Sequence, residues 1–211
     1  MENFHDLRLI QGKKNCEAGL VHRIDNDTRG LVLVAASQDF YDRITEEQKG
    51  DRFIKTYGAT CRYTGRTMDL PDDDSFPPLN EKLEKMLDSL KNNTNNRSFQ
   101  FFLSSKFRFY GNCRKLVRPV TDLSGPAAIK KASPKEYKTE INLKKTEDGT
   151  FQAQCCISQG FKHQVRCHLS WLGFPVVQDP FYDPLYAPDS HENIFDFTAC
   201  GLQFLEWNFT L

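Results

Sequence analysis

Apolar and polar side chains alternate along several segments of the chain, which is the pattern of half-buried β-strands. In the segment 53–62, Phe53, Tyr57 and Cys61 fall on one face. The same period of two predicts strands at 99–109, 137–143 and 151–157, and the turn at 147–149 joins the last two as a hairpin. A final strand is expected between Thr198 and Trp207.

The continuous apolar run 31–36 has no alternation, so it predicts a short strand buried on both faces. Ser37 follows as a candidate N-cap, and Phe40, Ile44 and Gln48 then recur at helical spacing up to Gly50. A second helix of about a dozen residues is expected over 161–172. Leucines at helical spacing between 79 and 90 predict a third.

Strands outnumber helices in this reading, and hairpins replace regular strand-helix-strand alternation. We therefore expect an α+β fold, a mostly antiparallel mixed sheet flanked by helices. The 211 residues suffice for a single catalytic domain, short at its N-terminus. The acidic, proline-punctuated and then asparagine-rich stretch at about 65–97 is expected to be an insertion.

Composition narrows the class of protein. Apolar residues make up 39% and charged residues 27% of the chain, which supports a packed core and excludes a low-complexity protein. The longest apolar run is too short to span a bilayer, and the first residues lack the features of a signal peptide. Seven cysteines occur without a Cys-x-x-Cys pair. We therefore expect a soluble cytoplasmic protein with reduced thiols, no metal site and no membrane partner.

Charge is balanced overall but unevenly distributed. Lys plus Arg and Asp plus Glu are each 28, giving zero net charge. Between residues 106 and 145 the chain has eleven basic and three acidic residues, a local balance of +8. This segregation allows one positive face, although the same charges would also suit a solvated sheet edge and loop.

Two polar segments are candidates for chemistry. Residues 19–30 place Asp, Arg and His directly before the apolar run, where burial is costly unless they pair with one another or with a ligand; a hydrogen-bonded turn is the alternative. Residues 158–169 are a glycine turn followed by basic and amide side chains, suited to an anion or a carboxylate such as Asp25. A solvated helix start is the simpler interpretation. His163 and His168 are five residues apart, which disfavours a metal site.

Together these segments resemble the RluA-type family of RNA pseudouridine synthases, whose signature is approximately His-Arg-Leu-Asp-x-x-Thr-Ser-Gly-Leu. The resemblance spans about 20–207 and rests on four segments in the family's order: residues 22–31, the Lys-x-Tyr of 55–57, Gly160 with 163–169, and 173–180. The sequence departs from the family at Arg29 for Ser, Phe161-Lys162 for Arg-Thr and Gln178 for Gly. It also lacks the family's upstream Lys-Pro-x-Gly motif.

The resemblance implies an enzyme that isomerises uridines in tRNA or rRNA to pseudouridine without a cofactor. Asp25 is the expected catalytic carboxylate, acting as a nucleophile at C1′ or as a base at C2′. Arg166 is expected to pair with it, and Tyr57 to stack on the uracil. A monomer is the default expectation. The residues expected to contact RNA or support the pocket are His22, Arg23, Thr28, His163, Gln164 and His168.

Three other readings remain open at this point. One is a catalytically inactive RNA-binding module of the same fold, which the missing upstream motif favours. Another is a glycosidase that uses Asp25 and Asp27 as its acid and base pair. The third is a purely structural protein, which would leave the charge beside the apolar run unexplained.

Overall fold

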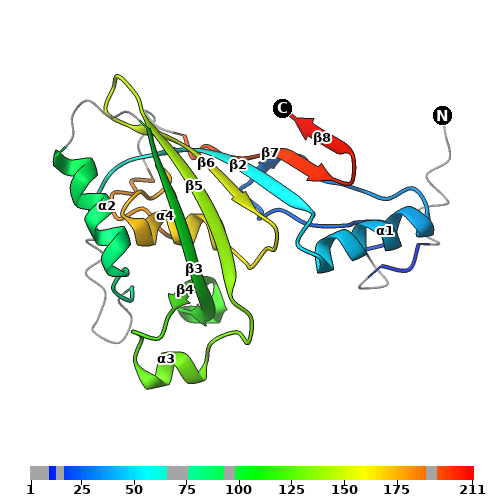
Figure 1. Cartoon of the computed structure of the whole chain (residues 1–211), viewed down its shortest axis with the longest axis horizontal. Helices are drawn as coiled ribbons and strands as arrows, with labels where there is room; N and C mark the ends of the chain where they lie inside the picture. Colours follow the sequence, from blue (N-terminus) through cyan, green and yellow to red (C-terminus); the bar gives the residue numbers. More distant parts are fainter. Residues whose placement is uncertain (1–9, 13–16, 66–75, 93–97, 189–193) are drawn as a thin grey trace.

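The computed structural model describes residues 10–12, 17–65, 76–92, 98–188 and 194–211. Within them the strands form one sheet in the order β1-β7-β2-β6-β5-β3-β4, with β8 paired to β7 (Figure 1). The strands are β1 (Arg29–Gly30), β2 (Ile54–Cys61), β3 (Ser98–Tyr110), β4 (Leu116–Val120), β5 (Tyr137–Lys145), β6 (Phe151–Ile157), β7 (Phe197–Phe204) and β8 (Trp207–Thr210). The helices are α1 (Gln38–Lys49), α2 (Glu81–Asn92), α3 (Pro126–Lys130) and α4 (Gln164–Leu172), with a 3-10 turn at Asn112–Arg114.

The sheet is mixed but mostly antiparallel, which confirms the predicted α+β class. Only β1 runs parallel to its neighbour, β7, among the described strand pairs. The predicted hairpin is formed by β5 and β6, with Lys145 opposite Phe151. β2 lies between β6 and β7, so the strand that bears Tyr57 is held on both sides.

One face of the sheet is covered by α4, and the main apolar core lies between them. All nine residues of α4 are buried. Tyr57, Ala59 and Cys61 point from β2 into this core. The helix α1 lies at the other end of the sheet (Figure 1). Its buried residues Tyr41 and Ile44 form a second cluster with Phe53 and Phe204. The candidate site lies between these two packed ends.

The apolar run 31–36 is not the strand buried on both faces that its composition predicts. The strand β1 ends at Gly30, before the run begins, and Val34 forms an isolated bridge with Leu20. Val32 and Val34 are 41% and 48% exposed. Alternate residues Leu31 and Leu33 pack on the α1 cluster, while Ala35 is fully buried. The run lies on one packed layer only, so a single face is covered.

Three further boundaries differ from the prediction. The helix expected from 161 begins at Gln164, because His163 has a left-handed backbone (φ 53°) that cannot continue a helix. The last strand is divided into β7 and β8 at Leu205, which has a φ of 49°. The prediction also missed β4, whose Pro119 argues against a strand; the end position of β4 in the sheet tolerates it.

The predicted insertion at about 65–97 lies partly outside the described residues, which omit 66–75 and 93–97. Its described part contains α2, and Leu79, Leu83 and Leu87 are buried as the helical spacing predicts. None of the described helices has the length and apolar character needed to cross a membrane.

Candidate active site

The turn that contains Asp25 is fixed to the sheet by backbone contacts. The Thr28 amide donates to the Asp25 carbonyl at 3.0 Å, and β1 then pairs with β7. Gly30 has a φ of 119°, and a Cβ at this position would lie 2.2 Å from the carbonyl oxygen of Ala199. Glycine is therefore required for the turn to approach β7 so closely.

Arg166, from the first turn of α4, approaches Asp25 from the buried side. Its Nη1 lies 3.7 Å from Oδ2 of Asp25. Its closer partner is the fully buried carboxylate of Asp179, which accepts from Nε and Nη2 at 2.7 Å each. The expected approach of Arg166 to Asp25 is present, but Asp179 holds the guanidinium in place. This bidentate geometry fixes the direction of Nη1.

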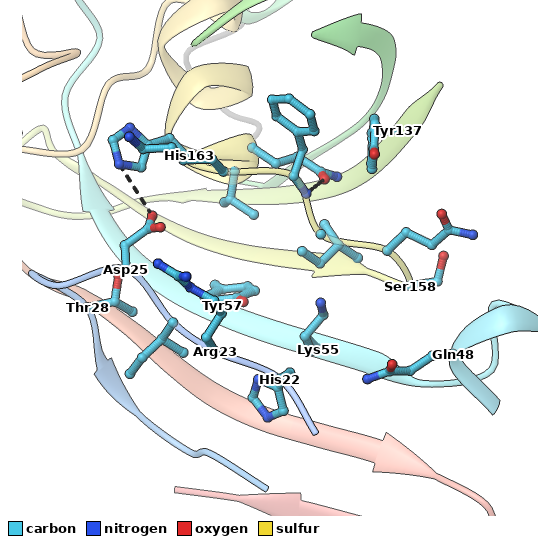
Figure 2. A pocket seen from close by; sticks show the side chains of 18 of the residues that line it. His22, Arg23, Asp25, Thr28, Gln48, Lys55, Tyr57, Tyr137, Ser158 and His163 are labelled. Carbon is cyan, nitrogen blue, oxygen red and sulfur yellow. Dashed lines mark hydrogen bonds and ion pairs between the residues drawn. The ribbon is translucent and has the colours of Figure 1, made fainter. Parts of the chain in front are cut away.

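His163 completes the group around Asp25 (Figure 2). Its Nε2 lies 3.9 Å from Oδ2 of Asp25, and its Nδ1 lies 3.2 Å from the Tyr182 hydroxyl. Burial, together with the charges of Arg166 and Lys162, lowers the pKa of His163 to about 3. The ring is thus neutral near pH 7, and its contact with Asp25 is polar rather than ionic.

The electrostatic state of Asp25 differs from that of an ordinary exposed carboxyl group. Burial raises its pKa above 3.8, although Arg166, Lys162 and Arg23 oppose this shift. The side chain nevertheless keeps 26% of its surface exposed. Asp25 is therefore a partly desolvated carboxylate with increased affinity for a proton, which suits a base or a nucleophile.

Tyr57 extends from β2 into the same cavity as Asp25 (Figure 2). Its ring stacks on Phe197 with centroids 5.2 Å apart and planes inclined by 4°. Burial, and then the nearby Asp25 charge, raise the pKa of the Tyr57 hydroxyl, which therefore stays protonated at neutral pH. The ring is thus held rigidly as a neutral platform.

These groups line a cavity of about 800 Å³ between the Asp25 turn, β2 and the start of α4. This volume falls in the usual range for small-ligand sites. Several cations also line it: Arg23, Lys49, Lys55, Lys135 and Lys162. The cavity therefore has the size and charge to receive a nucleotide.

Most of the residues expected to contact RNA line this cavity, namely His22, Arg23, Thr28, His163 and Gln164. His22 accepts from the Leu33 amide, and burial with the charge of Lys55 lowers its pKa to about 4, so it is neutral near pH 7. Gln164 is 2% exposed and donates to the Lys138 carbonyl and the Thr139 hydroxyl, so it supports the wall.

His168 requires a correction. It is fully buried, lies outside the cavity lining, and sits 2.9 Å from the Ser105 hydroxyl and 2.8 Å from the Thr139 hydroxyl. Because the His168 ring is fully enclosed, this position has no surface that could contact RNA. Asp27 is exposed and also outside the lining, so the Asp25 and Asp27 pair required by a glycosidase does not face one cavity.

Sequence reasoning assigned no role to several residues of the site. Asp179 belongs to the segment compared with the family, but only the folded chain shows it bound to Arg166. Lys55, Tyr137, Phe161 and Lys162 line the cavity as well. The alternation of 137–143 could have placed Tyr137 on the inner face of its strand. Among the described residues, no three His, Cys, Asp or Glu side chains are placed to hold a metal ion.

Curated relatives are distant and longer than this chain. It is 23% identical over 175 residues to the mitochondrial tRNA pseudouridine(32) synthase of Saccharomyces cerevisiae, covering 83% of this chain and 30% of the relative. An uncharacterised RNA pseudouridine synthase of Chloroflexus aurantiacus is 24% identical, with coverage of 79% and 39%. The chain thus spans less than half the length of these relatives.

Solved structures show the same fold. Human RNA Pseudouridylate Synthase Domain Containing 1 matches with a TM-score of 0.56 and 17% identity, over 87% of this chain and 62% of that chain. Human RNA Pseudouridylate Synthase Domain Containing 4 matches with a TM-score of 0.57 and 16% identity, over 91% and 70%. The RNA pseudouridylate synthase family model matches residues 1–171. Because this match covers most of the chain, the protein belongs to the RNA pseudouridylate synthase family.

Proposed function

We propose that the protein is an RNA pseudouridine synthase that isomerises uridine in RNA, with Asp25 as its catalytic carboxylate. The single observation that supports this most is the position of Asp25 in a cation-lined cavity, with Nη1 of Arg166 3.7 Å from its Oδ2. A carboxylate near the sugar is the group that the reaction needs, and Arg166 stabilises its charge when the nucleotide excludes water.

The reaction breaks the bond between N1 and C1′, turns the uracil, and joins C5 to C1′. The proton on C5 leaves as the new bond is completed, and N1 takes up a proton in its place. Product and substrate are therefore isomers, and no cofactor is consumed. Asp25 either attacks C1′ or removes the C2′ proton, and both routes require its ionised form. Tyr57 would stack on the released uracil and keep it close to C1′.

The target nucleotide must leave its stack to reach Asp25, because the carboxylate lies inside the cavity. Arg23 and Thr28 line the cavity together with Asp25 and would contact the flipped nucleotide or its phosphate. The proposal covers tRNA and rRNA, acted on by a single copy of the chain. A yeast relative is named as a tRNA pseudouridine synthase, so tRNA is the first substrate to assay.

The test is release of tritium from RNA labelled at C5 of uridine, which accompanies isomerisation. We expect release by the wild type, none by Asp25→Asn, and near wild-type release by Asp27→Asn. Loss in both variants would favour a paired carboxylate mechanism. RNA binding by the wild type without tritium release would show an inactive RNA-binding module and refute the proposal.

A further inference from the structure

A group of partly exposed rings lies beside the cavity, away from Asp25. Phe161 and Tyr137 both line the cavity and have ring centroids 5.1 Å apart. Phe109, 39% exposed, is 5.4 Å from Phe161. Beneath them, buried Phe107 stacks on Phe161 at 5.2 Å with planes inclined by 9°. We call Tyr137, Phe161 and Phe109 the aromatic rim; its central ring is supported rigidly on one face.

Cations accompany these rings. Lys135 and Lys162 are exposed and line the same cavity as Tyr137 and Phe161. The Lys162 ammonium donates to the Arg114 carbonyl at 3.4 Å, and the Arg114 guanidinium lies over Phe109 at 4.5 Å. Rings interleaved with exposed cations suit single-stranded nucleic acid, because every base has a stacking face and every nucleotide a phosphate.

The aromatic rim differs chemically from the site around Asp25. Asp25, His163 and Arg166 offer a carboxylate and polar hydrogens, suited to sugar chemistry. The rim offers flat apolar surface flanked by positive charge. Phe161 also stands where the family pattern compared above has Arg, so this ring is a feature of this chain's own sequence.

We propose that the aromatic rim stacks an unpaired nucleobase adjacent to the target uridine, with Lys135 and Lys162 on the phosphates beside it. This inference rests on the proposed function, since it takes RNA as the ligand. When the uridine is flipped out, its neighbour loses a stacking partner, and the rim replaces it. The preferred substrate class is therefore RNA in which the target and its neighbour are single-stranded or in a loop.

The experiment uses two seven-nucleotide RNAs with a central uridine and 2-aminopurine on its 5′ or 3′ side. Binding is followed by fluorescence on the Asp25→Asn protein, which keeps the RNA unreacted. We expect quenching with one of the two RNAs. Adding Phe161→Leu should weaken quenching and raise the dissociation constant about 5- to 150-fold, the range for loss of one base stack. Phe102→Leu is the matched control, since Phe102 is 64% exposed and outside the cavity lining.

Binding of heparin, a polyanion without bases, separates stacking from charge. Phe161→Leu should leave the affinity for heparin unchanged, whereas Lys162→Gln should lower the affinity for both RNA and heparin. Absence of quenching at both positions, or equal quenching in Phe161→Leu, would overturn the inference even if tritium release proves the enzyme active. Quenching that depends on Phe161 without tritium release would support the rim and refute the proposed activity. Tyr137→Leu is the second variant if Phe161→Leu does not fold.

Discussion

The two walls of the candidate site are built in opposite ways. The Asp25 turn is half open: Arg23, Asn26 and Asp27 are exposed, and a few backbone bonds hold it to β7. The opposite wall, α4, is buried throughout. Arg166 has no exposed surface, and Asp179 fixes it through two short hydrogen bonds. Asp25, the proposed catalytic carboxylate, thus lies on the accessible wall, and Arg166 lies on the rigid one.

Each wall also contains a buried polar atom that has no hydrogen-bond partner among the described residues. Arg166 Nη1 and Thr28 Oγ1 are buried polar atoms without a hydrogen-bond partner in the described structure. Buried polar atoms without a partner cost stability, and both of these atoms belong to residues that line the cavity. We expect the α4 wall to determine stability and the Asp25 turn to determine rate, and the following predictions separate the two.

The largest effect is expected from Asp25→Asn. If the reaction needs this carboxylate, the rate should fall at least about 10⁴-fold, as when essential groups are removed from other enzymes. This corresponds to more than about 5 kcal/mol in activation free energy. Single-turnover tritium release measures it, with Asp27→Asn as the control. Residual activity near the wild-type level would remove Asp25 from the chemistry.

Asp179→Asn should affect stability and rate together. Removing one partner of a buried ion pair costs about 3–5 kcal/mol, which urea unfolding would detect. The Asp179 charge also raises the pKa of Asp25, so its loss should shift the acidic limb of the rate profile to lower pH. If stability falls but the acidic limb of the pH-rate profile does not move, Asp179 has a structural role only.

His168→Leu should destabilise the protein without changing the chemistry. The substitution removes the ring that contacts the Ser105 and Thr139 hydroxyl groups. Thr139 keeps its hydrogen bond from Gln164, whereas the buried Ser105 hydroxyl loses the ring as its partner, at a cost of about 1–3 kcal/mol. Urea unfolding should show this loss, while kcat of the folded fraction stays near wild type. A large fall in kcat in a fully folded variant would contradict the idea that α4 determines stability and the Asp25 turn determines rate.

The smallest effect concerns pH. Because burial raises the pKa of Asp25 above 3.8, the carboxyl group binds its proton more tightly in the folded state. Its ionised form therefore opposes folding at neutral pH, and this cost is relieved as the pH falls through the raised pKa. We expect Asp25→Asn to unfold at the same or a higher temperature than wild type at pH 7. The difference between the two unfolding temperatures should become smaller at acidic pH. Tritium release by wild type should decline over the same acidic range.

Much of the fold could be predicted from alternation, because β2, β3, β5 and β6 each have one face on the core. The run 31–36 was mispredicted because composition does not show that only one layer covers it. Local motifs named Asp25, Tyr57 and Arg166 as candidate site residues, and all three line one cavity in the structure.

The sequence could not show how these side chains are paired. The main partner of Arg166 is Asp179, which is thirteen residues further along the chain and lies beside α4 only in the folded protein. The raised pKa of Asp25 depends on enclosure by several segments of the chain. The prediction that His168 contacts RNA is wrong for the same reason, because the helical pattern does not show that all nine residues of α4 are buried.

Gly30 has a consequence for how this protein can be altered. The backbone of Ala199 occupies the space that any side chain at position 30 would need. Replacement would lift the turn from β7 and displace Asp25 without touching a reactive atom. Variants that test the proposed function can therefore change the exposed residues Asn26, Asp27 and Arg29, whereas Gly30 must be kept.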